Sequence, residues 1–304
     1  MGSVVEAVRF LGPENCVVSI VEGNSVDGTV EILEALRPEM EKLGVKYQLI
    51  SNELPPDDGR RIFHLAEWRN LALEPLLAEN LTTRFVDDDP VVIFLNDVAI
   101  CPEDILELAH QRRFLGADMT CAMDWSHVMG LSRPTFYDAW VSRTMTGNSF
   151  FYIDPEDGSW SRAQELFHDD ESTLERFRSH RPVQVFACWN GAVAFSAKPL
   201  LEEGVRFRDG YKDECRMGEP TYFCKDLWKS GHGKIAVVPT VNLEYDDYHG
   251  MWIKGRKGYV SEVMLHVDEQ AQDWKIEWKE PPEKVLCMPG WTDQSWVPWD
   301  EHLP

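Results

Sequence analysis

Four acidic residues close apolar runs in the N-terminal part of the chain, and such a placement can serve metal chemistry. Glu22 and Asp27 end the first run, Asp97 follows the third, and Asp124 follows the fourth. If these runs form parallel strands, ligands bind at the carboxyl ends of the strands, and carboxylates gathered there suit Mg²⁺ or Mn²⁺. A single aspartate after a strand is more often a helix cap or turn residue, so the hypothesis depends on several of them meeting.

The elements that would position these acids alternate along the chain. Apolar, β-branched runs predict strands at residues 16–22, 45–50, 91–95, 119–123, 183–188, 192–196, 235–238 and 241–245. Helical spacing predicts helices at 33–43, 62–76, 102–113 and 220–229. Pro38 would break the first of these helices, and residues 125–180 are expected to form aromatic loops and short helices. The alternation is typical of an open, mainly parallel sheet with helices on both faces.

The net charge restricts the possible ligands. The chain has 304 residues, a formal net charge of −22 and 43% hydrophobic residues, which is a globular composition. Such a charge repels phosphate backbones, so extended nucleic-acid binding is not expected. An anionic ligand such as a diphosphate would need a local divalent cation, a helix N-terminus or one or two arginines.

Several common signatures are absent. The motifs GxGxxG, GxxxxGK[ST], HExxH and GxSxG do not occur, which leaves dinucleotide, ATP, zinc-protease and serine-hydrolase functions unsupported. The seven cysteines include no CxxC pair, and their odd number leaves at least one thiol free. Asn80 begins a glycosylation sequon. No run of about 18 apolar residues predicts a membrane span in this stretch, although an anchor upstream of Met1 would be compatible with it.

Short blocks in a fixed order carry a resemblance to a known family. They are FLGPEN at 10–15, VSI at 18–20, DGT at 27–29, RI at 61–62, LAE at 65–67, RN at 69–70, FLNDV at 94–98, CAMDW at 121–125, FYD at 136–138, CWNG at 188–191 and CKDLW at 224–228. Together they resemble the cryptococcal mannosyltransferase type, the fungal capsule-associated α-1,3-mannosyltransferases of glycosyltransferase family 69. The resemblance spans residues 10 to about 250.

The resemblance implies an α/β fold: a GT-A-like, Rossmann-type mixed sheet flanked by helices, with an irregular tryptophan-rich C-terminal extension. We expect one catalytic domain at 1–250, with a nucleotide-sugar half at 10–124 and an acceptor half at 125–250, and the extension packed on it at 251–304. The implied activity is metal-dependent, retaining transfer of mannose from GDP-mannose to a mannose-containing glycan in α-1,3 linkage. The implied cofactor is Mn²⁺ or Mg²⁺. The family's place is the Golgi lumen, as type II membrane proteins with an N-terminal anchor.

Two alternatives stay open: the same fold with another donor such as a UDP-sugar, and a non-catalytic glycan-binding relative. The second is kept open by the reduced metal motif, because the family's usual DxD reads Asn96-Asp97-Val98 and keeps one carboxylate. Asp97 is the first choice as metal ligand, followed by His249 and then Asp247, and a surface histidine is the alternative for His249. The residues expected to bind the nucleotide sugar are Ser19, Glu22, Asp27, Arg69, Asn96 and Asp97.

Catalysis and acceptor binding are assigned to the later blocks. Glu219 is the expected catalytic carboxylate near the anomeric carbon, with Asp213 and Asp226 as runners-up. The stretch before it departs from the family pattern, which leaves the cysteine pairing open. The residues expected to bind the acceptor are Asp124, Trp125, Trp189 and Asn190. Each of these residues also has an ordinary structural role as the alternative: a salt bridge on the helix surface for Arg69, a helix cap for Asp27, a solvated loop for Glu219, and core packing for the tryptophans.

Overall fold

The computed structural model describes residues 1–304 except 24, 52–58, 79–88, 128–132, 270 and 304, so the sequon at Asn80 lies outside the described residues. The helices are α1 (Gly2–Leu11), α2 (Thr29–Leu43), α3 (Arg61–Leu77), α5 (Pro102–Leu115), α6 (Glu171–Arg178), α7 (Lys198–Glu202), α8 (Glu219–Lys229), α9 (Asp247–Lys257) and α10 (Val260–Met264), with 3₁₀ turns η1 (Pro13–Asn15) and η2 (Gln272–Trp274). The strands are β1 (Val17–Glu22), β2 (Lys46–Ser51), β3 (Val91–Leu95), β4 (Met119–Ser126), β5 (Thr135–Phe136), β6 (Arg143–Thr144), β7 (Val183–Ala187), β8 (Ala192–Ser196), β9 (Ile235–Leu243), β10 (Lys284–Cys287) and β11 (Ser295–Pro298).

The main sheet has the strand order β3-β8-β4-β9-β7-β6, and β5 pairs with β4. It is a mixed sheet flanked by helices, as the fold prediction states. The expectation that it is mainly parallel is wrong, because β4 and β9 form the parallel pair and the other described pairs of this sheet are antiparallel. The strand β8, which comes from a later part of the chain, lies between β3 and β4 and runs against both.

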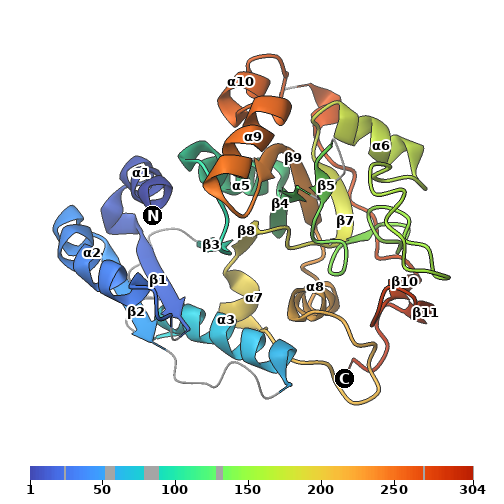
Figure 1. Cartoon of the computed structure of the whole chain (residues 1–304), viewed down its shortest axis with the longest axis horizontal. Coiled ribbons are helices and arrows are strands. Elements are labelled where there is room, and N and C mark those ends of the chain that lie inside the picture. The colour runs from blue at the N-terminus through green and yellow to red at the C-terminus, as the bar shows by residue number, and fades with distance from the viewer. Residues whose placement is uncertain (24, 52–58, 79–88, 128–132, 270, 304) are drawn as a thin grey trace.

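Alternating side chains assign the two faces of the sheet to different helices. Along β4, Cys121 and Met123 join a large core cluster that includes residues of α3 and α8, whereas Ala122 joins a cluster with Leu108 of α5 and Val260 of α10. This is the period-two pattern of a strand that is buried on both faces. Figure 1 shows α5, α9 and α10 over one face of the sheet and α3 and α8 on the other.

The strands β1 and β2 form a separate parallel pair rather than joining the main sheet, within the part of the chain that the structure describes. They pack with α1 and α2 around the buried side chains of Val8, Met40 and Tyr47. The helix α2 runs through Pro38 to Leu43 and is capped by Gly44, whose φ of 98° is left-handed. The expectation that Pro38 breaks this helix is therefore wrong.

The C-terminal extension is more regular than expected. The predicted boundary between 250 and 251 falls inside α9, which packs against β9, and β10 and β11 form an antiparallel hairpin. Its tryptophans differ in burial: Trp274 is buried against Leu115 of α5, whereas Trp296 is exposed. Among the described residues, no helix has the length and apolar character needed to cross a bilayer.

Candidate functional site

The ends of three strands meet at one edge of the main sheet. β3, β4 and β9 run in the same direction, because β3 and β4 both pair antiparallel with β8 and β9 pairs parallel with β4. The backbone N–H of Asn96, after β3, donates to the carbonyl of Gly191, and the N–H of Ala99 donates to that of Glu244, after β9. The residues after β3, those after β9 and the turn before β8 are thus joined at this edge. Asp97 and Asp124 both belong to it.

Arg69 and Glu219 form an ion pair at this edge. Arg69 lies on α3, and its Nε donates to Oε1 of Glu219, at the start of α8, over 2.8 Å. Its guanidinium also lies 4.2 Å from the ring centroid of Trp189. The Oδ1 atom of Asn96 accepts from Nε1 of Trp189 at 3.1 Å and from Arg69 at 3.5 Å. These contacts connect residues with three different predicted roles. Arg69 and Asn96 were expected to bind the nucleotide sugar, Trp189 the acceptor, and Glu219 was the expected catalytic carboxylate.

The ion pair is shielded from water. The side chains of Arg69 and Glu219 are 11% and 3% exposed. The salt bridge proposed as the bland alternative for Arg69 is therefore present, but it joins two elements and is not a pair on the surface of one helix. Contact between Arg69 and a diphosphate stays a prediction.

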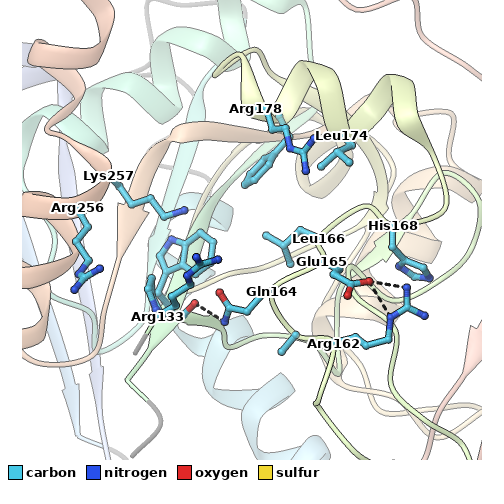
Figure 2. Close-up of a pocket in the computed structure, with 14 residues that line it drawn as sticks. Arg133, Arg162, Gln164, Glu165, Leu166, His168, Leu174, Arg178, Arg256 and Lys257 are labelled. Atoms are coloured by element: carbon cyan, nitrogen blue, oxygen red, sulfur yellow. Dashed lines mark hydrogen bonds and ion pairs between the residues drawn. The ribbon is translucent and has the colours of Figure 1, made fainter. Parts of the chain in front are cut away.

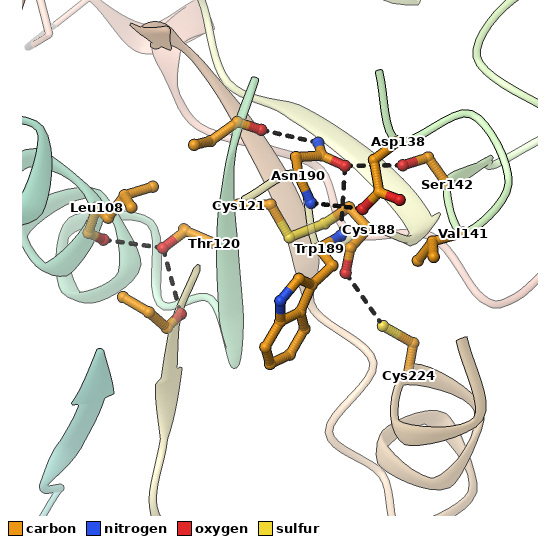
Figure 3. Close-up of a disulfide and its surroundings, with 12 residues drawn as sticks. Leu108, Thr120, Cys121, Asp138, Val141, Ser142, Cys188, Trp189, Asn190 and Cys224 are labelled. Carbon is orange, nitrogen blue, oxygen red and sulfur yellow. Dashed lines mark hydrogen bonds between the residues drawn. A yellow bond between two sulfur atoms is a disulfide. The ribbon is translucent and has the colours of Figure 1, made fainter. Parts of the chain in front are cut away.

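Asn190 is held by hydrogen bonds on both sides of its side chain and at its backbone (Figure 3). Its N–H donates to Oδ2 of Asp138 at 2.9 Å, its Nδ2 donates to the carbonyl of Ala122 at 2.7 Å, and its Oδ1 accepts from Ser142 at 2.8 Å. Its φ is 55°, a left-handed conformation that asparagine tolerates better than most residues. Because these bonds consume the amide, they give Asn190 a positioning role for the turn at this edge.

A disulfide joins this turn to the sheet. Cys188, directly before Trp189, is bonded to Cys121 of β4, and a second disulfide joins Cys215 to Cys287 of β10. Cys224 is a free thiol that donates to the carbonyl of Cys188 (Figure 3). The pairing that the sequence left open thus ties the end of β7 to β4 and ties the segment before α8 to the C-terminal hairpin.

Asp124 and Asp138 are two carboxyl groups with perturbed acidity. Burial, followed by repulsion from Asp138, raises the pKa of Asp124 well above its ordinary value. Burial also raises the pKa of Asp138 to about 6, with a further upward effect from Glu219. Asp124 accepts a hydrogen bond of 2.6 Å from the hydroxyl of Tyr245. Sequence reasoning did not single out Asp138 as a functional residue, since it lies in the stretch without periodicity.

A possible metal-binding group lies where β9 leads into α9. One ligand atom each from Glu244, Asp246 and His249 lies within 4.8 Å of the others. Asp246 caps α9 by accepting from the backbone N–H of His249 at 2.9 Å, and its carboxylate lies 2.5 Å from Nδ1 of that ring, which raises the pKa of His249. Two carboxylates and an imidazole are a donor set that Mn²⁺ accepts.

One of the three predicted metal ligands belongs to this group, and the other two do not. His249 is one of its members, whereas Asp247 and the exposed Asp97 are not. Glu244 and Asp246, which the sequence analysis did not name, join His249 in this group, and metal binding by Asp97 or Asp247 stays a prediction. The acidic run from 244 to 247 was the signal that could have identified them.

The N-terminal residues expected to contact the nucleotide lie on or after β1. Glu22 is buried, and its Oε1 accepts from the backbone N–H of Ser25 at 2.7 Å. The hydroxyl of Ser19 is buried without a hydrogen-bond partner among the described residues. Asp27 accepts from the hydroxyl and the backbone N–H of Thr29 at 2.6 and 3.1 Å, and these bonds lower its pKa. The contacts of Asp27 are those of a residue at a helix start.

The runners-up to Glu219 lie elsewhere. Asp213 is exposed in a turn, with a φ of 66°. Asp226 is about 10 Å along α8 from Glu219 and forms an ion pair with Arg208 at 2.7 Å. Arg208 also binds Glu214, whose other oxygen lies 2.5 Å from Nζ of the fully buried Lys225. The structure brings neither aspartate to the group around Arg69.

The two tryptophans expected to bind the acceptor are buried. Trp189 is 1% exposed and Trp125 is 4% exposed. The indole N–H of Trp125 donates to Asn242 at 2.8 Å, and Nζ of Lys257 lies 4.0 Å from its ring centroid. Core packing, the bland alternative, describes their surroundings, and a direct contact of either ring with a sugar stays a prediction.

The sequence of this chain is similar to known mannosyltransferases. The sequence profile of the family described as cryptococcal mannosyltransferase 1 matches residues 1–226. The protein named alpha-1,3-mannosyltransferase CMT1 of Cryptococcus neoformans var. neoformans serotype D (strain JEC21 / ATCC MYA-565) is 36% identical over 327 residues, which cover 99% of this chain and 69% of that protein.

Solved structures with a similar arrangement are more distant. Residues 1–349 of TarS from S. aureus in complex with UDP match with a TM-score of 0.42 and 14% identity, over 88% of this chain and 61% of that chain. GalNAc-T7 with UDP, GalNAc and Mn²⁺ matches with a TM-score of 0.37 and 16% identity, over 75% of this chain and 37% of that chain. This chain spans less than two thirds of either structure.

Proposed function

This chain belongs to the family of cryptococcal mannosyltransferase 1, and from that premise we propose that it is a metal-dependent, retaining α-1,3-mannosyltransferase. Its donor is GDP-mannose and its acceptor is a mannose-containing glycan. The observation that carries the proposal is the 36% identity, over 99% of this chain, to an enzyme named alpha-1,3-mannosyltransferase.

The possible cation site supports a nucleotide-diphosphate sugar as the donor. Glu244, Asp246 and His249 would hold Mn²⁺ or Mg²⁺, with Asp97 on the same sheet edge as a further ligand and Asp247 in reserve. Bound there, the cation would neutralise the diphosphate of the donor and polarise it as a leaving group. A protein with a net charge of −22 needs such a local positive charge to bind a sugar nucleotide. On the other side of the nucleotide, Ser19, Glu22 and Asp27 would border the base and ribose.

Glu219 is the proposed catalytic carboxylate. Retention of configuration requires stabilisation of positive charge at the anomeric carbon more than it requires a strong base. Glu219 is nearly enclosed, lies opposite Arg69, and begins a helix whose first two turns are buried. Arg69 fixes the orientation of this carboxylate and is itself stacked on Trp189. A carboxylate held in this way is preorganised, which is what makes such groups effective in transition states.

A transfer assay tests this function. The protein is incubated with Mn²⁺, α-linked mannobiose and, in parallel, GDP-mannose, UDP-glucose, UDP-galactose or UDP-N-acetylglucosamine, and products are identified by mass and NMR. We expect transfer from GDP-mannose, with an α-1,3-linked product. Transfer from a UDP-sugar in its place, or a β-linked product, would contradict the proposal. Binding of mannobiose without transfer from any donor would favour a non-catalytic glycan-binding relative.

We further propose that the protein acts in the Golgi lumen as a type II membrane protein. The two disulfides support an oxidising compartment, since disulfides persist mainly in secretory and extracellular proteins. Resistance of the catalytic domain to protease in intact Golgi vesicles, and its loss after detergent, is the expected result. Digestion in intact vesicles would contradict this location.

A further inference from the structure

A basic pocket lies beside the candidate site in this strongly acidic protein. Its volume is about 610 Å³, within the usual range for small-ligand sites. Among its described lining residues, five are cationic and one is acidic: Arg133, Arg162, Arg178, Arg256, Lys257 and Glu165. The acid is already paired, because Glu165 accepts from Arg162 at 2.6 Å. The pocket is therefore a local concentration of positive charge on a chain whose net charge is −22.

The cations reach the pocket from separate parts of the chain. Arg178 ends α6, Lys257 ends α9 and Arg133 precedes β5, and Figure 2 shows them around one hollow with the Arg162–Glu165 pair across it. Basic residues are common in the last turn of a helix, where they stabilise its negative end. That preference explains Arg178 and Lys257 separately, but it does not explain why two helices and a loop direct their cations into the same hollow.

Two lining groups lack a hydrogen-bond acceptor among the described residues. No ion pair of Lys257 with an acid is found among the described residues; its ammonium lies over the ring of Trp125, and burial lowers its pKa. Nδ1 of His168 is buried and has no hydrogen-bond partner there. A buried polar atom without a partner is costly, and a ligand with acceptor oxygens could supply one to a group of this kind.

Two elements, β4 and α9, contribute residues both to the pocket and to the candidate site. Trp125, which lines it, directly follows Asp124 on β4. Helix α9 contains His249 in its first turn and Lys257 at its end, about 12 Å further along. Between them, His127 stacks on His249 with centroids 5.1 Å apart and contacts Trp252 with its edge. The basic pocket and the candidate site thus lie at the two ends of α9 and share the end of β4.

We propose that this pocket binds a carboxylate or phosphate group of the glycan acceptor, so that the acceptor is an acidic oligosaccharide. The inference rests on the proposed function, since the ligand is the acceptor of the same reaction. A concave, sugar-sized hollow fits an oligosaccharide better than the flat face of an anionic membrane, which supplies the competing chemistry. Arg178 and Lys257 are the residues that would hold the anionic group, because each contributes a charged donor that has no ion pair with an acid among the described residues.

Calorimetric titration without a donor tests the proposal. The probes are α-linked mannobiose, its 6-phosphate, and the disaccharide with one C6 oxidised to a carboxylate. We expect the anionic probes to bind about tenfold more tightly than mannobiose, the size of one charge-assisted contact, and to lose this advantage as salt is added. The double variant R178Q/K257Q should bind all three probes alike. The control K42Q/K229Q removes two exposed cations on other helices and should keep the preference.

The outcomes separate this inference from the proposed function. Equal affinity of wild type for neutral and anionic probes overturns the inference, while mannosyl transfer to mannobiose in a parallel assay would leave the function standing. Equal loss in R178Q/K257Q and in the control also overturns it. A preference for anionic probes without transfer from any donor supports the pocket and removes the function. Vesicles of phosphatidylserine and phosphatidylcholine are the last probe: binding that needs Arg178 and Lys257, without disaccharide binding, assigns the pocket to a membrane and overturns the proposal.

Discussion

Arg69 and Glu219 are 150 residues apart in sequence, yet the guanidinium of the first donates to the carboxylate of the second over 2.8 Å in a nearly closed setting. The pair brings α3 against the start of α8, at the edge where β3, β4 and β9 end. It also leaves one oxygen of Glu219 free of this bond. The arrangement gives the proposed reaction an oriented negative charge that does not depend on a flexible loop.

Glu219→Gln is expected to lower kcat about 100-fold, because a neutral amide cannot stabilise developing positive charge as a carboxylate does. KM for GDP-mannose should change much less. Steady-state kinetics check this, with Glu202→Gln, an exposed residue of α7, as the matched control. Unchanged turnover in Glu219→Gln would remove Glu219 from the mechanism.

Asp138 is expected to give the fold a specific pH dependence. Its pKa is about 6 in the folded protein and about 3.9 in an unfolded chain, so the folded state binds more protons between these values. By linkage, the stability contributed by this group is present below about pH 4 and is lost as the pH rises to 6. The melting temperature of wild type minus that of Asp138→Asn should therefore fall between pH 4 and pH 7. A difference that is constant, or that grows with pH, would show that this assignment is wrong.

The disulfide between Cys121 and Cys188 is expected to stabilise the fold substantially. It joins residues 67 positions apart, and loop-closure entropy for that length corresponds to about 4 kcal/mol. Urea unfolding of the Cys121→Ala/Cys188→Ala variant should show a loss of this order. Cys16→Ser, which removes a half-buried free thiol, is the control, and an equal loss in both variants would contradict the prediction.

The sequence predicted most strands and helices of the fold, and the reason is local. The run at 91–95 and the helix after Pro102 carry their own signals, including acids in the first turn, Arg112 and Arg113 in the last, and Gly116 at the end. The position of β8 between β3 and β4 has no local signal, since it is decided by packing between distant segments. For that reason the parallel sheet suggested by alternating elements became a mixed one.

Part of the candidate site could be proposed from residue type and from position near the ends of predicted strands or helices. Asn96, Arg69, Trp189 and Glu219 stood out by type, but their mutual contacts arise from four separate elements. Asp138 and the basic pocket could not be found in this way, because both depend on the stretch between β4 and α6, which has no periodicity. The net charge of the chain also gave no indication of a basic pocket, because the cations that line it come from separate segments and meet only in the folded protein.

Metal dependence is tested by the affinity for GDP, measured by calorimetry with Mn²⁺ and with a chelator. Mn²⁺ should tighten GDP binding about tenfold or more, since the cation must offset a strongly negative protein. His249→Ala should abolish this gain, and His266→Ala, which alters an exposed histidine beyond α10, should retain it. Equal affinity with metal and with chelator, or tighter binding of UDP than of GDP, would contradict the proposal of a metal-dependent GDP-mannose transferase.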